Sequence, residues 1–167
     1  MNAPKISLIA AISENNVLAK DGKIPWKIPT DVKRYREKIK GHVSIAGRKT
    51  FDASYTETVN IVVTRDPYYQ SPLHAIVVHS VAEALKKAKS DEVLQKADYQ
   101  DEIFVIGGGE IFKETIVFAD KLYLTIIHQT IEGTTFFPEY SDFKKAVFKE
   151  DHEENGYTFT FLDLERE

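Results

Sequence analysis

The fold is decided by a short apolar stretch near the N-terminus, Ile6-Ser7-Leu8-Ile9-Ala10-Ala11-Ile12. The polar run Ser13-Glu14-Asn15-Asn16 ends it. A continuous apolar run of this length, bounded by turn-forming residues, is typical of a strand that is buried on both faces of a sheet. We therefore predict that residues 6–12 form a central strand.

Strands and helices alternate along the rest of the chain. A helix is predicted over residues 30–40, with Thr30 as its N-cap and Asp31 in its first turn. A second helix is predicted to begin at Ser80, where Glu83 three residues later completes a capping box. Further strands are predicted at residues 42–46, 59–64, 75–79, 102–106 and 121–128.

The C-terminal segment has the pattern of a hairpin. Residues 143–151 and 157–164 flank the dipeptide Asn155-Gly156, which favours a tight two-residue turn. Strands that alternate with helices and end in a hairpin predict a mixed, mostly parallel sheet with helices on both faces. We expect one domain over residues 1–167, without repeats or linkers.

Composition excludes several classes of protein. The chain has 167 residues, 43% of them hydrophobic and 29% charged, with a net charge of -4 and no Cys. This profile is typical of a globular domain and argues against disorder, disulfide frameworks, thiolate metal sites and nonspecific binding to nucleic acid. No leader or membrane-spanning segment is expected. The expectations are therefore a cytoplasmic location, no nucleic-acid or membrane partner, no metal, and a monomer.

Glycine-rich turns follow two of the predicted strands, at Gly47 and at Gly107-Gly108-Gly109. Each is expected to open a helix, where free backbone N–H groups attract phosphate and glycine allows close approach. A plain tight turn explains the triple glycine about as well on its own. A Rossmann domain has a G-x-G-x-x-G motif directly after its first strand. Here a long polar connection without this motif follows the first predicted strand, which argues against a Rossmann domain.

Three cations come at the ends of predicted strands: Arg48, Lys49 and Arg65. The carboxyl edge of an open α/β sheet is where ligands bind, so converging positive charge there suits an adenosine 2'-phosphate. Without the glycine turns, solvated surface cations would be the favoured interpretation.

The acidic candidate is Asp31. A carboxylate in the first turn of a helix is also favoured by the helix dipole alone. Its apolar neighbours Val32 and Tyr35, with Trp26 upstream, suggest instead a carboxyl in a hydrophobic cleft with a raised pKa. The connection over residues 14–28 is long enough to be a lid.

The remaining polar candidates are weaker. Thr125 lies in an otherwise apolar strand and more often satisfies its hydroxyl locally than meets a ligand. The acids Glu153 and Glu154 beside the hairpin turn are expected to be solvated.

Several short segments, in their order along the chain, resemble segments of the dihydrofolate reductase family. They are Ile6-Ser7-Leu8-Ile9-Ala10-Ala11, Ile24-Pro25-Trp26, Pro29-Thr30-Asp31, Gly47-Arg48-Lys49-Thr50, Val63-Thr64-Arg65, Ile106-Gly107-Gly108-Gly109, Leu122-Tyr123-Leu124-Thr125, and Glu132-Gly133 through Phe137-Pro138. The resemblance implies an eight-stranded sheet with about four flanking helices and NADPH-dependent reduction of 7,8-dihydrofolate to 5,6,7,8-tetrahydrofolate. Hydride would pass from C4 of the nicotinamide to C6 of the pterin, and N5 would be protonated.

The resemblance also assigns roles to residues. Asp31 would bind the pterin 2-amino group and N3, Thr125 would lie close behind through a water, and Trp26 would hold an ordered water. The other substrate-binding positions would be Ile9, Ala10, Val32, Tyr35, Arg36 and Ile106. The cofactor-binding positions would be Ala11, Leu18, Gly47, Arg48, Lys49, Thr50, Thr64, Arg65, Gly107, Gly108, Gly109, Glu110, Ile111, Phe112 and Thr135.

The sequence departs from the family at several positions. Thr58 stands where the family has an Arg that clamps the folate tail, and the connection over residues 50–59 is short. Phe112 occupies a position where the family commonly has a Tyr, and Ala19 one where it commonly has a Gly. Thr134 occupies a position where an Asp often forms a hydrogen bond with the lid. These departures leave two alternatives open: a reductase of another pterin or of a riboflavin-pathway pyrimidine, and a binding protein that has lost catalysis.

Overall fold

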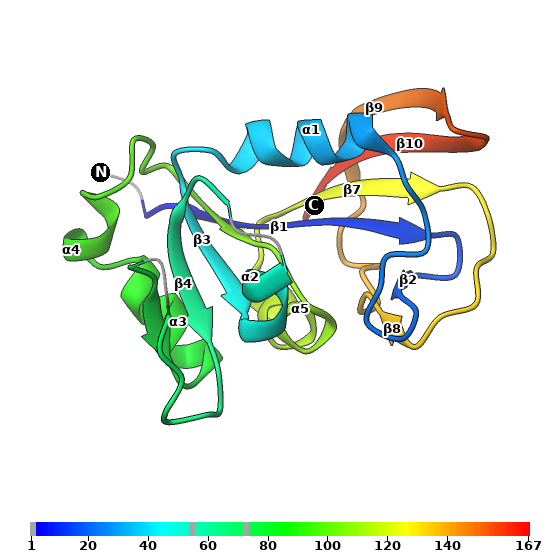
Figure 1. The fold of residues 1–167 in the computed structure, drawn as a ribbon. Helices are drawn as coiled ribbons and strands as arrows, with labels where there is room; N and C mark the ends of the chain where they lie inside the picture. The colour runs from blue at the N-terminus through cyan, green and yellow to red at the C-terminus, as the bar shows by residue number, and fades with distance from the viewer. Residues whose placement is uncertain (1–2, 54–55, 72–73) are drawn as a thin grey trace.

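Strand β1 (Lys5–Ser13) runs through the sheet interior, as the apolar run at residues 6–12 predicts. The computed structural model describes residues 3–53, 56–71 and 74–167. The main sheet has eight strands in the order β5-β4-β3-β6-β1-β7-β10-β9 (Figure 1). The other strands are β3 (Val43–Gly47), β4 (Val59–Val63), β5 (Ile76–Val78), β6 (Glu102–Val105), β7 (Lys121–Ile127), β9 (Lys145–Glu154) and β10 (Tyr157–Glu165).

The sheet is parallel from β5 to β7 and antiparallel at its C-terminal end. All pairs from β5 through β4, β3, β6 and β1 to β7 are parallel, and β10 pairs antiparallel with both β7 and β9. The hairpin turn lies at Asn155-Gly156, both at positive φ. The mixed, mostly parallel sheet with its terminal hairpin is therefore confirmed. The carboxyl ends of six parallel strands meet along one edge, where open α/β sheets bind ligands.

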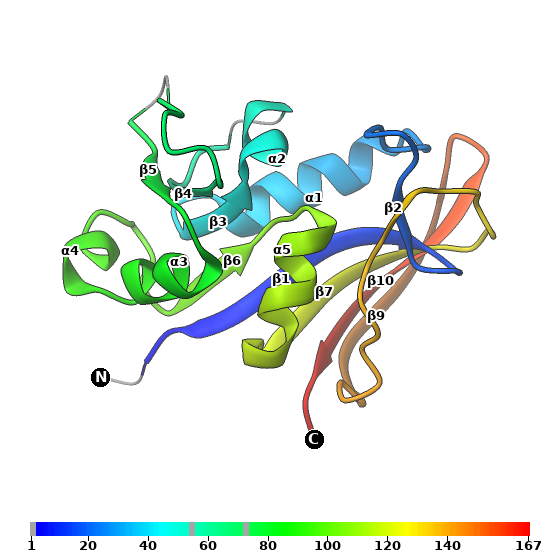
Figure 2. The ribbon, with the colours of Figure 1, turned by 90° about the horizontal axis from the view of Figure 1, so that it is seen from below.

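Helices cover both faces of this sheet, as Figures 1 and 2 show. On one face lie α1 (Pro29–Ile39) and α2 (Arg48–Ala53), which contribute Ile39 and Phe51 to a core with Ile9 and Phe104. The other face carries α3 (Val81–Ala88), α4 (Asp91–Leu94), α5 (Gly109–Thr115) and the 3-10 helix η1 (Ile116–Phe118). The described residues thus hold five α-helices where about four were expected. The additional one, α4, is a single turn capped by Ser90.

The N-terminus of α1 differs from the prediction. Thr30 is not the N-cap: the helix starts at Pro29, Ile28 precedes it, and Ile28 has no capping side chain. The cap comes instead from the hairpin, because the Glu154 carboxylate accepts hydrogen bonds from both the backbone N–H and the hydroxyl of Thr30. These bonds hold the pKa of Glu154 below its usual range. Glu153 is exposed, as expected, and Glu154 is accessible to solvent but also anchors the helix that carries Asp31.

Helix α3 begins as predicted. Ser80 is its N-cap, and the Ser80 hydroxyl accepts a hydrogen bond from the Glu83 N–H. None of the helices in the described part of the chain is long and apolar enough to cross a membrane.

A second, two-stranded sheet was not predicted. Strand β2 (Val17–Ala19) lies within the long connection after β1 and pairs antiparallel with β8 (Thr135–Phe136). Two further bonds tie the connection down: the Thr134 N–H donates to the Ala19 carbonyl, and the Asp21 N–H donates to the Thr134 hydroxyl. Thr134 thus bonds to the connection over residues 14–28, although it stands where the family has an Asp. The strands escaped prediction because two and three residues give no readable periodicity.

Candidate active site

A cavity of about 730 Å³ lies between α1 and the carboxyl ends of the central strands. Its lining is mostly apolar and is drawn from β1, the connection at residues 14–28, α1, α2, the residue that follows β6, α5 and β7. The lining residues are Ile9, Ala10, Ala11, Leu18, Ile24, Trp26, Lys27, Ile28, Pro29, Asp31, Val32, Lys33, Arg34, Tyr35, Arg36, Glu37, Thr50, Ile106, Phe112 and Thr125. A large apolar cavity with a few converging polar groups is the usual form of a small-molecule site.

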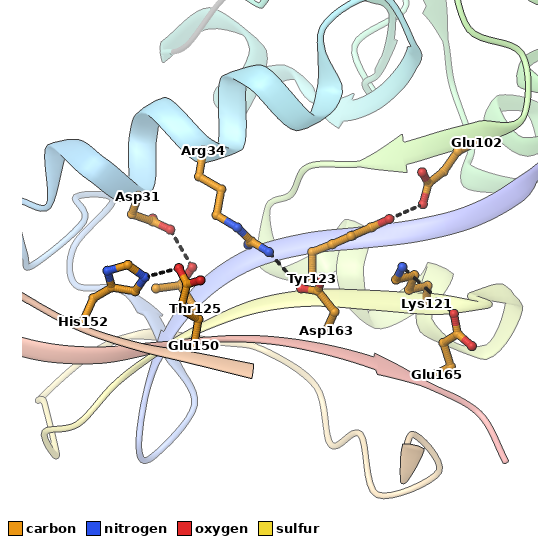
Figure 3. Close-up of polar contacts among 10 residues, drawn as sticks. All are labelled: Asp31, Arg34, Glu102, Lys121, Tyr123, Thr125, Glu150, His152, Asp163 and Glu165. Carbon is orange, nitrogen blue, oxygen red and sulfur yellow. Dashed lines mark hydrogen bonds and ion pairs between the residues drawn. The ribbon is translucent and has the colours of Figure 1, made fainter. Parts of the chain in front are cut away.

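Asp31 and Thr125 are the polar centre of this cavity. The Thr125 hydroxyl donates a hydrogen bond of 2.5 Å to Oδ1 of Asp31 (Figure 3). Burial raises the pKa of the Asp31 carboxyl, while the Thr125 hydrogen bond and the Arg34 charge oppose the rise. Apolar neighbours alone predict the same direction. Thr125 was expected close behind, joined through a water; the structure instead joins the two side chains directly.

The sheet register brings these two residues together. Thr125 lies in β7 opposite Ala11 of β1 and Phe161 of β10, on the face that α1 covers. Asp31 lies in the first turn of α1, whose start the hairpin fixes. Each residue therefore depends on a different long-range contact for its position. Trp26 is buried in an apolar cluster that also contains Ile28.

All the residues predicted to bind the substrate line this one cavity. Tyr35 is partly buried in it, and burial raises its pKa to about 12, so the phenol stays neutral. Val32 at 45% exposure leaves part of its side chain free at the cavity mouth. The predicted substrate set is thus a spatial cluster, although its contacts with substrate stay a prediction.

The two glycine turns also meet. The Gly47 N–H donates to the Gly107 carbonyl at 2.8 Å. The peptide between Gly107 and Gly108 is cis, and Gly107 lies at φ 119°, a backbone conformation that L side chains rarely adopt. At Gly109 a Cβ atom would lie 2.7 Å from Thr135. Gly107 is therefore required by its backbone conformation, and Gly109 by the close approach of Thr135 in β8.

The predicted cations lie beside these turns but outside the cavity. Arg48 starts α2, 3.6 Å from the Asp52 carboxylate and with its guanidinium 5.9 Å from the Tyr69 ring. Arg65 and Lys49 are exposed just after β4 and β3, which are neighbours in the sheet. The first turns of α2 and α5 leave N–H groups without partners inside their helices. The glycine turns, these N–H groups and the cations lie along one edge of the sheet. Together they fit the phosphate groups of a dinucleotide.

The predicted cofactor residues thus divide into two groups. Ala11, Leu18, Thr50 and Phe112 line the cavity. Outside it lie Gly47, Arg48, Lys49, Thr64, Arg65, Gly107, Gly108, Gly109, Glu110, Ile111 and Thr135. Ile111 is buried in the main core, and the Thr64 hydroxyl accepts from the Asp66 N–H.

At Thr58 the structure has hydroxyl contacts in place of the family's tail-binding Arg. The Thr58 hydroxyl bonds with Ser44 at 2.6 Å and with the Asn60 side-chain oxygen at 2.9 Å. Thr58 therefore belongs to a polar network between β3 and β4 and presents no charge to the cavity. The cations that do line the cavity are Lys27, Lys33, Arg34 and Arg36.

Sequence reasoning missed Arg34, which is the most important of the cavity-lining residues that it did not predict. Its partner is Asp163, at 3.0 Å. A signal was present, because Asp163 continues the alternation of Phe159 and Phe161 on the buried face of β10. An acid at such a position needs a cation, and the spacing of three from Asp31 places Arg34 on the same helix face.

Comparisons with known proteins support one family over the whole chain. The family model described as "Dihydrofolate reductase" matches residues 5–166. Among similar curated proteins, the dihydrofolate reductase of Haemophilus influenzae is 37% identical, covering 96% of this chain and 98% of that protein. Dihydrofolate reductase type 3 of Salmonella typhimurium is 33% identical, with 97% and 98% covered. A solved dihydrofolate reductase from Enterococcus faecalis, complexed with NADP(H) and RAB-propyl, is similar with a TM-score of 0.81 and 33% identity, covering 97% of this chain and 96% of that chain.

Proposed function

The chain belongs to the dihydrofolate reductase family, and from that premise we propose how its cavity performs the NADPH-dependent reduction of dihydrofolate to tetrahydrofolate. The observation that carries the assignment of roles is the Asp31–Thr125 pair at the centre of an apolar cavity. It is the arrangement that a flat, partly polar heterocycle needs: apolar walls for its faces and one carboxylate for its N–H groups.

Asp31 recognises the pterin by accepting hydrogen bonds from its 2-amino group and N3. The Thr125 hydroxyl occupies Oδ1 of Asp31 and so fixes the rotation of the carboxyl group. The ionised carboxylate favours positive charge on the pterin, and so favours protonation at N5 electrostatically without donating a proton itself. Because Asp31 lies among apolar walls, this charge is less screened than it would be in water.

NADPH, when bound, supplies the hydride. The residues that would hold it are the glycine turns at Gly47 and Gly107, the first turns of α2 and α5, and the neighbouring cations. Leu18 in β2 lies close to both Gly109 and the cavity, so the β2–β8 sheet connects the lid to the cofactor side. A lid in this position excludes water from the reacting groups.

A first prediction concerns the selectivity for a 2'-phosphate. Arg48→Gln is expected to raise the KM for NADPH about tenfold or more and leave the KM for NADH nearly unchanged, because in the proposed role Arg48 contacts the 2'-phosphate, which NADH lacks. Steady-state kinetics with both cofactors measure this. Lys113→Gln, which removes an exposed cation near the end of α5, is the matched control. Equal effects on both cofactors would contradict the role of Arg48.

A second prediction concerns the folate tail. Because Thr58 supplies no charge, we propose that Arg36 on the cavity wall takes the tail carboxylate. Arg36→Gln should raise the KM for dihydrofolate about tenfold and leave the KM for a tail-less dihydropterin unchanged. Lys40→Gln, just beyond the same helix and outside the cavity, is the control. A rise for both substrates would place Arg36 elsewhere in the mechanism.

The two alternatives left open by the sequence are not favoured. The relatives named dihydrofolate reductases match nearly their whole length, so a riboflavin-pathway reductase or a binding protein without activity has no support from the comparisons. We further propose a single-domain cytoplasmic monomer that takes only small molecules as ligands. The modest net charge of -4 supports the lack of a nucleic-acid partner.

A further inference from the structure

A buried ion pair lies at the wall of the cavity, one turn along α1 from Asp31. Nη2 of Arg34 donates to Oδ1 of Asp163 in β10 at 3.0 Å, and the side chains are only 16% and 7% exposed. The guanidinium also lies over the Phe161 ring, 4.4 Å from its centroid, and 5.7 Å from that of Phe148. Figure 3 shows the contact between Arg34 and Asp163. Arg34 therefore contacts Asp163 and two aromatic rings and still lines the cavity.

The stability of the fold does not explain this pair. Two charges lose hydration on burial, and their attraction does no more than offset that loss in many proteins. Apolar side chains of similar size are often as stable in such places. The neighbours Phe148 and Phe161 are themselves apolar and would accept such a replacement. A role in the site is then the better account of the pair.

The charged and titratable groups around Arg34 and its neighbours come from five elements. They are Asp31 and Lys38 on α1, Tyr123 on β7, Asp163 on β10, and the Glu150–His152 pair on β9, with Glu102 of β6 and Lys121 of β7 around Tyr123. Burial above all, and then Glu102, raises the pKa of Tyr123, so this phenol is neutral. The His152 ring is tilted against that of Phe161, with ring centroids 4.7 Å apart, and His152 pairs with Glu150. Among these groups, Arg34 forms its ion pair with the Asp163 carboxylate, and its charge also acts on the Asp31 carboxylate.

We propose that Arg34 is a positioning residue of the reaction: pinned by Asp163 and Phe161, it keeps a permanent positive charge beside Asp31 and maintains that carboxylate in its ionised form. The charge opposes the effect of burial on the pKa of Asp31. Arg suits the task because its guanidinium stays protonated when buried. The inference rests on the proposed function of Asp31, since an ionised Asp31 matters only if it binds the pterin.

The direct test is the titration of Asp31 in the protein without ligands. Aspartate labelled with ¹³C at the carboxyl carbon gives one NMR signal for each residue, and the signal lost in Asp31→Asn identifies Asp31. In Arg34→Met the titration midpoint of Asp31 should move upward by about one pH unit. Arg34→Lys, which keeps the charge, should stay closer to wild type, and Lys40→Met, an exposed cation beyond α1, should not move it.

A double variant keeps the test sound if Arg34→Met alone fails to fold. Arg34→Met with Asp163→Leu replaces the ion pair by an apolar pair and leaves no buried charge unpaired. The proposal expects the Asp31 midpoint to rise in this variant too, with the acid limb of the kcat/KM profile moving by the same amount. An unchanged midpoint in the double variant would show that the pair is only structural and overturn the proposal. The titration needs no turnover, so full activity of Asp31→Asn would instead overturn the proposed function.

Discussion

Asp31→Asn is expected to lower the turnover of dihydrofolate about a hundredfold or more at neutral pH. The amide has nearly the size of the carboxyl group and still accepts the hydrogen bond from Thr125. It carries no charge, however, and so does not favour the protonated pterin. Single-turnover measurement of NADPH consumption reports the loss.

Two further readouts locate the effect. The affinity for NADPH should be unchanged, because Asp31 lies on the substrate side of the cavity and away from the glycine turns. Residual activity should increase as the pH falls, since protonation of the substrate in solution then replaces what the carboxylate did. Undiminished turnover in Asp31→Asn would refute its role.

Gly133→Val is expected to lower the turnover about a hundredfold, because small displacements in a site have effects of this size. A Cβ atom at Gly133 would lie 2.2 Å from Cγ1 of Val17 and 3.0 Å from the Ala19 carbonyl. Both belong to β2, so β2 has to move away from β8. Leu18 between them lines the cavity and moves with the strand.

The control for this variant is its exposed neighbour. Glu132 forms a surface ion pair with Lys20 at 3.5 Å. Such pairs contribute little, so Glu132→Ala should keep nearly full turnover. Turnover close to wild type in Gly133→Val would show that the β2–β8 contact does not govern the reaction.

Much of the fold could be predicted because its signals are local. The apolar run of β1, the capping box of α3 and the Asn155-Gly156 turn each specify their own structure within a few residues. The parallel order then follows from strands that alternate with helices. The cavity residues could be predicted because short segments of the chain resemble those of the family in the same order. The structure places all the expected substrate-binding residues in one cavity around Asp31.

The parts that escaped prediction depend on contacts between distant segments. Glu154 caps α1 from 124 residues away, and nothing in the sequence near Thr30 reveals it. The short strands β2 and β8 form only because they pair with each other. The pair of Arg34 and Asp163 spans 129 residues, although an acid on the apolar face of β10 was a usable clue. Long-range pairing of polar groups is therefore what the sequence conceals here.

The most direct test of the account is NADPH oxidation by the purified protein with dihydrofolate, measured beside a tail-less dihydropterin. The account predicts saturable turnover of dihydrofolate to tetrahydrofolate that depends on Asp31. Turnover of the tail-less dihydropterin alone, or of neither compound, would contradict it.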